Sequence, residues 1–172
     1  MITKPRLVPV DGAASPPETA DVAPASDVHV SHAVDTLART LWGEARGEGR
    51  LGMAAVAAGI MNRVAVARQH GNRFWWGHDV TSVCRKPWQF SCWNEDDPNR
   101  AKLAAVTADD PAFDTALQIA RQAVNGMLRD LTAPPDALGA THYHAQGITP
   151  GWAVGQRPIA AIGRHLFYRL AA

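Results

Sequence analysis

The chain has 172 residues, a length typical of a single domain with room for a tail. Lysine and arginine together number 17 against 16 aspartates and glutamates, and the resulting net charge of +1 argues against a dedicated nucleic-acid binder. Hydrophobic residues make up 47% of the chain, which excludes overall disorder, and no apolar run approaches the length of about 18 residues that predicts a membrane span.

Residues 1–30 have the composition of a disordered, Pro/Ala-rich tail. They hold five of the 12 prolines and no aromatic residue, so they offer too little apolar surface to offset the entropy of ordering. Lys4 and Arg6 are followed by proline-broken segments, whereas a secretory signal peptide has an apolar run there. The sequence therefore predicts one folded domain at residues 31–172.

The first predicted helix runs from Ser31 to about Arg46. Apolar residues recur from Val34 at i+3, i+4, i+7, i+8 and i+11, the spacing of one helix face. We expect Ser31 to be the N-cap and Gly47 to stop the helix.

A second helix is predicted at residues 50–67. It is apolar on most sides and rich in alanine, which is typical of a buried helix that its neighbours approach closely. Glu48 lies just before it, and an acidic side chain favours a helix N-terminus. We therefore expect Glu48 to begin this central helix.

Residues 70–100 are rich in glycine and proline and are predicted to be mostly loop. A short helix is expected at 100–107. Asp110 as N-cap and Pro111 in the first turn predict a stronger helix that ends before Pro134. Its expected core face consists of Phe113, Leu117, Ala120, Val124 and Leu128.

Two segments near the C-terminus, Thr141–His144 and His165–Tyr168, have the composition of short strands that pair in a small sheet. The predicted fold class is therefore mainly α (α+β), with a small β element near the C-terminus.

The two cysteines, Cys84 and Cys92, lie eight residues apart and leave two interpretations open. They are either two unrelated buried thiols or a disulfide that closes a short loop. A disulfide would stabilise the fold by about 2–3 kcal/mol and indicate a protein that works outside the cytosol. Their spacing does not fit the usual zinc motif.

Glu44 breaks the apolar pattern of the first helix. At about 100° per residue it lies about 20° from Leu37 and about 60° from Leu41, on the stripe that faces the core. A carboxyl group among apolar side chains favours its neutral form, which a general acid needs near neutral pH. The alternative is that Glu44 lies at a frayed helix end, where it is either solvated or paired with Arg46 or Arg63.

A series of short motifs runs through the folded part of the chain. In chain order they are WGEARGEG at 42–49, Gly52 with the alanine-rich run to IMNRV at 60–64, QFSCW at 89–93, THYH at 141–144, Trp152, and IGRHLFY at 162–168. Together they resemble the cell-wall hydrolase family typified by the spore-cortex lytic enzyme SleB. The resemblance covers about residues 32–170, and its first two motifs are the most specific.

This resemblance implies a lysozyme-like, mainly helical catalytic domain that acts on peptidoglycan, with Glu44 as the catalytic acid. Glycosidases usually employ two carboxylates, and the sequence shows no obvious second one on a patterned face. The C6 hydroxyl of the muramic sugar can attack internally, so a lytic transglycosylase with one acid/base residue is expected. Hydrolysis by water, the muramidase reaction, is the close alternative. The acidic residues considered as a second carboxylate are Asp79, Glu95, Asp96 and Asp97.

Six of the 12 aromatic residues lie between residues 74 and 93. They either fill the core beneath a loop or form a wall of the glycan groove, since sugar faces stack on aromatic rings. The predicted substrate-binding residues are Gln89, Phe90, Ser91 and Trp93 on one wall, and Tyr143, His144 and Trp152 on the other.

Two other function classes fit parts of the sequence. A zinc-dependent N-acetylmuramoyl-L-alanine amidase would need His142, His144 and His165 close together, but no H-E-x-x-H motif is present, and we expect these histidines to be structural. A non-catalytic glycan-binding module would use the aromatic residues and would not need Glu44.

The expected partner is peptidoglycan, bound by a monomer without cofactor or metal, without nucleic acid and without stable membrane insertion. We expect the protein to act in the periplasm or cell wall. The lack of a recognisable signal peptide is typical of an endolysin made in the cytoplasm and released at lysis, and equally of a piece of an exported protein.

Overall fold

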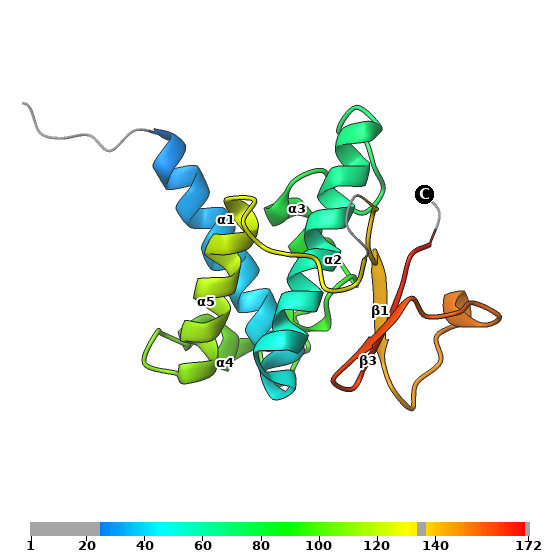
Figure 1. Ribbon diagram of the computed structural model, residues 1–172. Coiled ribbons are helices and arrows are strands. Elements are labelled where there is room, and N and C mark those ends of the chain that lie inside the picture. The colour runs from blue at the N-terminus through cyan, green and yellow to red at the C-terminus, as the bar shows by residue number, and fades with distance from the viewer. Residues whose placement is uncertain (1–24, 134–136, 171–172) are drawn as a thin grey trace, which may run out of the picture.

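The computed structural model describes residues 25–133 and 137–170, and Figure 1 shows its helices beside a small sheet. Helices α1, α2 and α5 pack together, and the strands lie against α2. This arrangement agrees with the predicted mainly helical class. The elements are α1 (Ala25–Ala45), the 3₁₀ helix η1 (Arg46–Glu48), α2 (Gly49–Gln69), α3 (Val80–Cys84), η2 (Ser91–Trp93), α4 (Arg100–Ala105), α5 (Pro111–Val124), β1 (His142–Ala145), η3 (Gly151–Ala153), β2 (Ala160–Ile162) and β3 (His165–Tyr168).

Helix α1 begins at Ala25, six residues before the predicted start at Ser31. Ser31 therefore lies inside the helix and is not its N-cap. Residues 25–31 contain no proline or glycine, so nothing in their backbone chemistry interrupts the helix. The predicted tail otherwise falls on residues 1–24, outside the described part of the chain.

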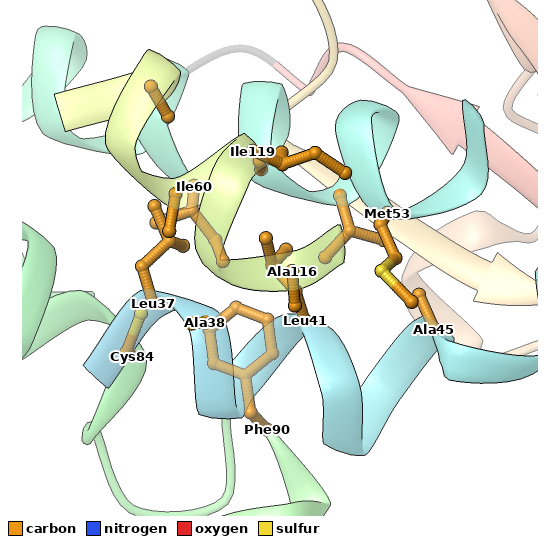
Figure 2. Close-up of a cluster of buried hydrophobic side chains, with 14 of the residues drawn as sticks. Leu37, Ala38, Leu41, Ala45, Met53, Ile60, Cys84, Phe90, Ala116 and Ile119 are labelled. Carbon is orange, nitrogen blue, oxygen red and sulfur yellow. The ribbon is translucent and has the colours of Figure 1, made fainter. Parts of the chain in front are cut away.

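The core lies where α1, α2 and α5 meet, and Figure 2 shows its side chains. Leu37 and Leu41 of α1 are fully buried against Ile60 of α2 and Ile119 of α5. Phe90 completes the cluster from the loop that follows α3. The predicted apolar stripe of the first helix is therefore its core face.

Helix α2 is the central helix, as its composition predicts, because 13 of its 21 residues are buried. The run from His32 to Gln69 is long and apolar enough by composition to cross a membrane, but 72% of its most apolar window is buried inside the domain. Burial among the other helices accounts for this composition.

Helix α5 begins as predicted, with the Asp110 side chain accepting hydrogen bonds from the Ala112 and Phe113 amides at 2.8 and 3.0 Å. It ends at Val124, well before Pro134. Its buried face is rotated from the predicted one, because the buried positions follow Phe113 at i+3, i+6, i+7 and i+10 instead of i+4, i+7 and i+11. The buried residues are Phe113, Ala116, Ile119, Ala120 and Ala123, whereas Leu117, Val124 and Leu128 are only partly buried.

Besides the three 3₁₀ helices, one α-helix and one strand are absent from the sequence prediction. Helix α3 lies in the expected loop region, and its start is fixed by a reciprocal capping box between Asp79 and Ser82. Strand β2 precedes β3 and joins it through Gly163 and Arg164, with Gly163 at a φ of 58° that favours glycine.

The three strands form an antiparallel sheet in the order β1-β3-β2. Tyr143 pairs with Phe167, and Ala145 pairs with His165. Side chains alternate between the faces of a sheet, so Tyr143, His165 and Phe167 share the face that packs on the helical core. His144 and Tyr168 lie on the opposite face.

An ion pair joins the sheet to the corner between α1 and α2. Glu48 makes no side-chain cap on α2, contrary to its predicted role. Its carboxylate instead accepts hydrogen bonds from the Arg164 backbone amide at 2.7 Å and from Arg164 Nε at 2.8 Å, and it pairs with Nη2 at 2.7 Å. A Cβ atom at Gly163 would collide with this carboxylate. The bond from the Arg164 amide is the main reason that the pKa of Glu48 lies below its ordinary value.

The core predicts a large cost for truncating a buried α1 side chain. Leu41→Ala should lower the free energy of unfolding by about 3 kcal/mol, because it leaves a cavity among α1, α2 and α5. Urea unfolding measures the difference. The control is Leu51→Ala, at a position that is 65% exposed, for which a change below about 0.5 kcal/mol is expected. Equal losses in the two variants would contradict this packing.

The Glu48–Arg164 pair predicts a pH-dependent stability. Glu48→Gln should destabilise the protein at pH 7 by about 1 kcal/mol, a modest value because solvent around the exposed Arg164 screens the pair. Since the folded-state pKa is lowered, the contribution of Glu48 is complete above its ordinary pKa of 4.5 and is lost as the pH falls below that value. Thermal unfolding should therefore separate the two proteins at pH 7 and bring them together under acid conditions. A difference that grows in acid would refute the assignment.

Candidate active site

Glu44 lies at the C-terminal end of α1, where three distant segments converge. Its Oε1 atom accepts hydrogen bonds from the Cys92 amide at 3.2 Å and from Ser91 Oγ at 3.5 Å. Its Oε2 atom accepts one from the Tyr143 hydroxyl at 3.2 Å. The half-buried carboxylate thus joins α1 to η2 and β1.

The alternative of a carboxylate paired with a neighbouring arginine is wrong. Arg46 donates to the backbone oxygens of Trp42 and Gly43 at 3.2 and 3.3 Å. Arg63 donates to the Thr141 oxygen at 2.6 Å. In the described part of the chain, Glu44 forms no ion pair, and every hydrogen bond to it comes from a neutral donor.

A small residue lets η2 approach Glu44. A Cβ atom added at Gly43 would lie 2.5 Å from Cys92 Cβ and 2.9 Å from Cys92 Sγ, closer than packed atoms can come. The glycine of the first motif therefore allows the Cys92 amide to reach the carboxylate of the next residue.

Tyr143 is held rigidly beside Glu44 by the aromatic residues of β3. Its ring centroid lies 5.0 Å from that of His165 and 5.7 Å from that of Phe167. Burial raises the pKa of the Tyr143 phenol well above its usual range, with a further contribution from the Glu44 charge. The hydroxyl is therefore protonated at neutral pH and donates to Glu44.

Arg63 supplies a buried positive charge behind this site. It is 7% exposed, and its guanidinium lies 5.7 and 5.5 Å from the ring centroids of Trp76 and Phe90. Burial lowers its pKa to about 10, so it remains charged at neutral pH. The sequence analysis gives Arg63 only as a possible partner of Glu44. In the structure, the bond from Arg63 to the Thr141 oxygen supports the start of β1 instead.

Two of the predicted substrate-binding residues have a structural role. Phe90 is buried in the core together with Trp76. The Gln89 side chain donates to the backbone oxygens of Val83 and Trp76 at 2.7 and 3.2 Å, which fixes the loop after α3. The QFSCW motif therefore brings only Ser91 and Cys92 to Glu44, and Gln89 and Phe90 position them.

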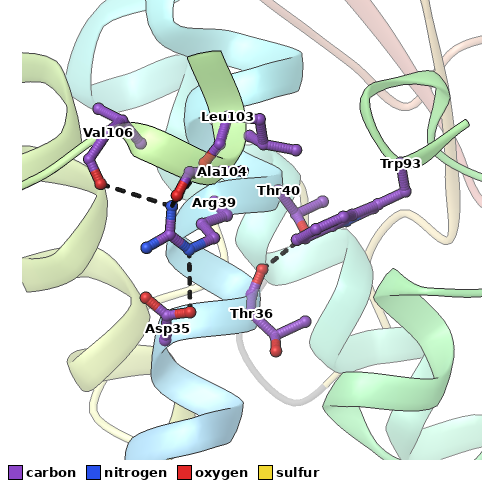
Figure 3. A network of polar contacts seen from close by, with 8 residues as sticks. All are labelled: Asp35, Thr36, Arg39, Thr40, Trp93, Leu103, Ala104 and Val106. Atoms are coloured by element: carbon purple, nitrogen blue, oxygen red, sulfur yellow. Dashed lines mark hydrogen bonds and ion pairs between the residues drawn. The ribbon is translucent and has the colours of Figure 1, made fainter. Parts of the chain in front are cut away.

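Trp93 is half-buried at the edge of a groove, and its indole nitrogen is already bonded inside the domain. Nε1 donates to Thr40 Oγ1 at 2.9 Å, and Thr40 donates to the Thr36 oxygen at 2.8 Å, as Figure 3 shows. The guanidinium carbons of Arg85 and Arg100 lie 4.1 and 5.2 Å from its ring centroid.

Trp88 is a feature that the sequence prediction did not single out. It is 81% exposed and has a φ of 65°, a left-handed conformation that costs a bulky residue about 1–2 kcal/mol. The Gln89 amide donates to the Lys86 oxygen at 3.1 Å across Pro87 and Trp88. Proline followed by a residue of positive φ is typical of a type II turn, in which glycine is preferred at the position of Trp88.

The expected second wall of the groove is not formed as predicted. Tyr143 reaches Glu44, but His144 and Trp152 lie together on the other face of the sheet. His144 bonds to the Tyr168 hydroxyl at 2.9 Å, and Trp152 packs edge-on against Tyr168 with centroids 5.4 Å apart. The alternation of side chains along β1 separates neighbours that the sequence grouped.

The same alternation separates the histidines of the amidase alternative. His165 faces the helical core, whereas His142 and His144 lie on the other face of the sheet. Burial lowers the pKa of His142 to about 4 and also lowers that of His165. Within the described residues no group of three His, Cys, Asp or Glu side chains is arranged to hold a metal ion.

Cys84 and Cys92 are free, buried thiols, so the disulfide interpretation is wrong. Cys84 packs in the core, and Cys92 packs against Gly43. Burial raises the pKa of Cys84 to about 12, and that of Cys92 is also raised. Both thiols are therefore neutral core residues at physiological pH.

Comparison with known proteins finds a spore cortex-lytic enzyme among the curated proteins and SleB catalytic domains among the solved structures. The spore cortex-lytic enzyme of Halalkalibacterium halodurans is 30% identical over 135 residues, which are 78% of this chain and 34% of that protein. The chain thus spans about a third of that relative's length.

Two solved structures share the fold. The catalytic domain of the germination-specific lytic transglycosylase SleB from Bacillus anthracis matches with a TM-score of 0.56 and 29% identity, covering 78% of this chain and 92% of that one. The catalytic domain of the Bacillus cereus SleB protein matches with a TM-score of 0.58 and 28% identity, covering 80% and 89%. The predicted lysozyme-like fold is confirmed.

The family described as Cell Wall Hydrolase matches residues 47–168. This range begins three residues after Glu44, so the interpretation of Glu44 rests on the geometry of its site. The match covers most of the chain, and this protein belongs to the Cell Wall Hydrolase family.

Proposed function

We propose that the protein cleaves the glycan strand of peptidoglycan between N-acetylmuramic acid and N-acetylglucosamine, with Glu44 as general acid and base. The observation that carries this proposal is the Glu44 carboxylate, held on both oxygens by neutral donors from η2 and β1. The family and the relatives named as lytic enzymes support the substrate class.

Three of the described acidic residues near the site are engaged in structural contacts, which favours a mechanism with one carboxylate. Glu48 is bound to Arg164, and Asp79 caps α3. Asp97 accepts a hydrogen bond from the Asn99 amide at 2.8 Å. Glycosidases that use water or a covalent intermediate need a second carboxylate next to the scissile bond. Internal attack by the substrate avoids this need.

In the proposed reaction, Glu44 first donates its proton to the glycosidic oxygen, and the bond from that oxygen to the anomeric carbon of the muramic acid breaks. The resulting carboxylate takes the proton of the muramic C6 hydroxyl, whose oxygen bonds to the same carbon. The products are a new hydroxyl end and an anhydro sugar, no water is consumed, and Glu44 is protonated again.

The hydrogen bonds to Glu44 distinguish its two oxygens. Oε1 accepts from both Cys92 and Ser91, which occupies its two lone pairs. Among the described residues, Oε2 accepts a hydrogen bond only from Tyr143, which leaves it a lone pair. We therefore assign the transferred proton to Oε2 and treat Tyr143 as the residue that positions it.

Replacing the acid tests the proposed function. Glu44→Gln should slow the clearing of a peptidoglycan suspension by about 10²–10⁴-fold, the usual contribution of a general acid, with little change in melting temperature. Mass spectrometry of the wild-type products should show muramic ends that are lighter than hydrated ends by one water molecule. The control is Asp109→Asn, at an exposed position before α5, which should retain lytic activity. Full activity of Glu44→Gln would overturn the assignment and favour an amidase or a binding module.

The positioning role of Tyr143 predicts a selective loss of rate. Tyr143→Phe should lower kcat by about tenfold while KM stays within about twofold, because one hydrogen bond to the acid is lost and the substrate surface is kept. Tyr168→Phe is the matched control, since its hydroxyl bonds to His144 on the other face of the sheet. Equal kcat values for Tyr143→Phe and the wild-type protein would exclude this role.

A further inference from the structure

An open groove of about 510 Å³ lies beside the candidate active site. It is lined by the loop after α3, by the residues that follow η2 and by the start of α4. Its lining differs from that of a typical sugar site because most of it is charged. The charged residues are Arg85, Lys86, Glu95, Asp96 and Arg100.

The charges in this groove are available to a ligand. Among the described residues, the side chains of Arg85, Lys86 and Arg100 form no ion pair with a carboxylate, and neither Glu95 nor Asp96 pairs with a cation. The groove therefore presents positive and negative groups that a partner of mixed charge would complement.

Trp88 adds an apolar surface to the same groove. Its indole is exposed although its backbone is strained, so burial does not offset the strain. Strained residues that a structure nevertheless fixes are concentrated at ligand-binding positions. The turn at Lys86–Gln89 and the Gln89 side-chain bonds fix Trp88 in this orientation.

The groove and Glu44 share one short element. In η2, Ser91 and Cys92 bond to Glu44, and Trp93 lines the groove. Trp93 also bonds to Thr40, which lies on the same side of α1 as Glu44 and one turn before it. A ligand in the groove would thus lie next to the sugar whose bond reaches Glu44.

Peptidoglycan offers one component that matches this surface. Its sugars carry no net charge when the lactyl group of muramic acid is linked to peptide. The peptide stem that branches from that lactyl group carries carboxylates, and in many walls the ammonium group of a diamino acid. The mixed charges of the groove therefore fit the stem better than the glycan.

We propose that this groove binds the peptide stem of the muramic acid next to the cleaved bond. Arg85, Lys86 and Arg100 bind its carboxylates, and Trp88 packs on its apolar atoms. Glu95 and Asp96 face its ammonium group. This inference rests on the proposed function, because it places the stem relative to a glycan bound at Glu44.

The test compares two polymers: intact peptidoglycan, and the same material stripped of its stems with an amidase. The double variant Lys86→Gln with Arg100→Gln should cleave intact polymer about tenfold more slowly than the wild-type protein and stripped strands within about twofold of it. Added salt should reduce the difference on the intact polymer. The control, Arg68→Gln with Arg121→Gln, removes two exposed arginines from α2 and α5 and should cleave both polymers at the wild-type rate.

Trp88→Gly separates binding from folding. Glycine suits the left-handed turn, so the melting temperature should stay equal or rise while cleavage of the intact polymer slows. A fall in melting temperature with unchanged cleavage would assign Trp88 to the fold and count against the proposal.

The outcomes are distinct. Losses confined to the intact polymer support the stem site, as would a wild-type protein that cleaves only polymer with stems. Equal losses on both polymers, or no loss on either polymer, overturn the stem site.

If the wild-type protein releases no glycosidic ends from either polymer, the proposed function fails. In that case, binding of a soluble disaccharide–tetrapeptide tests the stem site by itself. A shift of the Trp88 indole NMR signal that the bare disaccharide does not cause supports the stem site. The absence of such a shift refutes it.

Discussion

The hydrogen bonds to the Glu44 carboxylate connect the parts of this domain that form the candidate active site. They join the end of α1 to η2 through Ser91 and Cys92, and to the sheet through Tyr143. A half-buried carboxylate needs such donors because its desolvation is otherwise costly. The close approach of η2 depends in turn on the missing side chain at Gly43. The position of the acid and the position of the groove wall are therefore set by the same contacts.

Two glutamates four residues apart have opposite surroundings at this corner. Glu48 is bound by the Arg164 guanidinium and backbone amide, which fix it as an anion and hold the β2–β3 turn. Glu44 receives only neutral donors in the described structure. A group that must gain and lose a proton is better served by the second environment. Glu48 thus supports the sheet, and Glu44 is the carboxylate that we propose transfers protons.

The sequence predicts the helices and the position of Glu44 on the core side of α1 well, because both follow from periodicity. The stripe from Val34 to Ala45 is the core face of α1, and Glu44 lies at its end beside the sheet. Membership in a family motif predicts substrate contact less well than periodicity predicts the helices. Gln89 and Phe90 of the QFSCW motif support the loop after α3 from inside the domain. The grouping of Tyr143 with His144 failed because it ignored the alternation of strand faces. Trp88 could not be recognised, because its importance lies in its φ angle and exposure, which depend on the tertiary structure.

In the proposed function, the glycan crosses the junction of α1, η2 and β1 with its scissile bond at Glu44. A crystal structure of the Glu44→Gln protein with a bound peptidoglycan tetrasaccharide tests it most directly. We expect the glycosidic oxygen about 3 Å from the side chain at position 44. We also expect the Tyr143 hydroxyl to contact that side chain still. A tetrasaccharide bound on the far face of the sheet, around Trp152 and His144, with no contact to position 44, would contradict it.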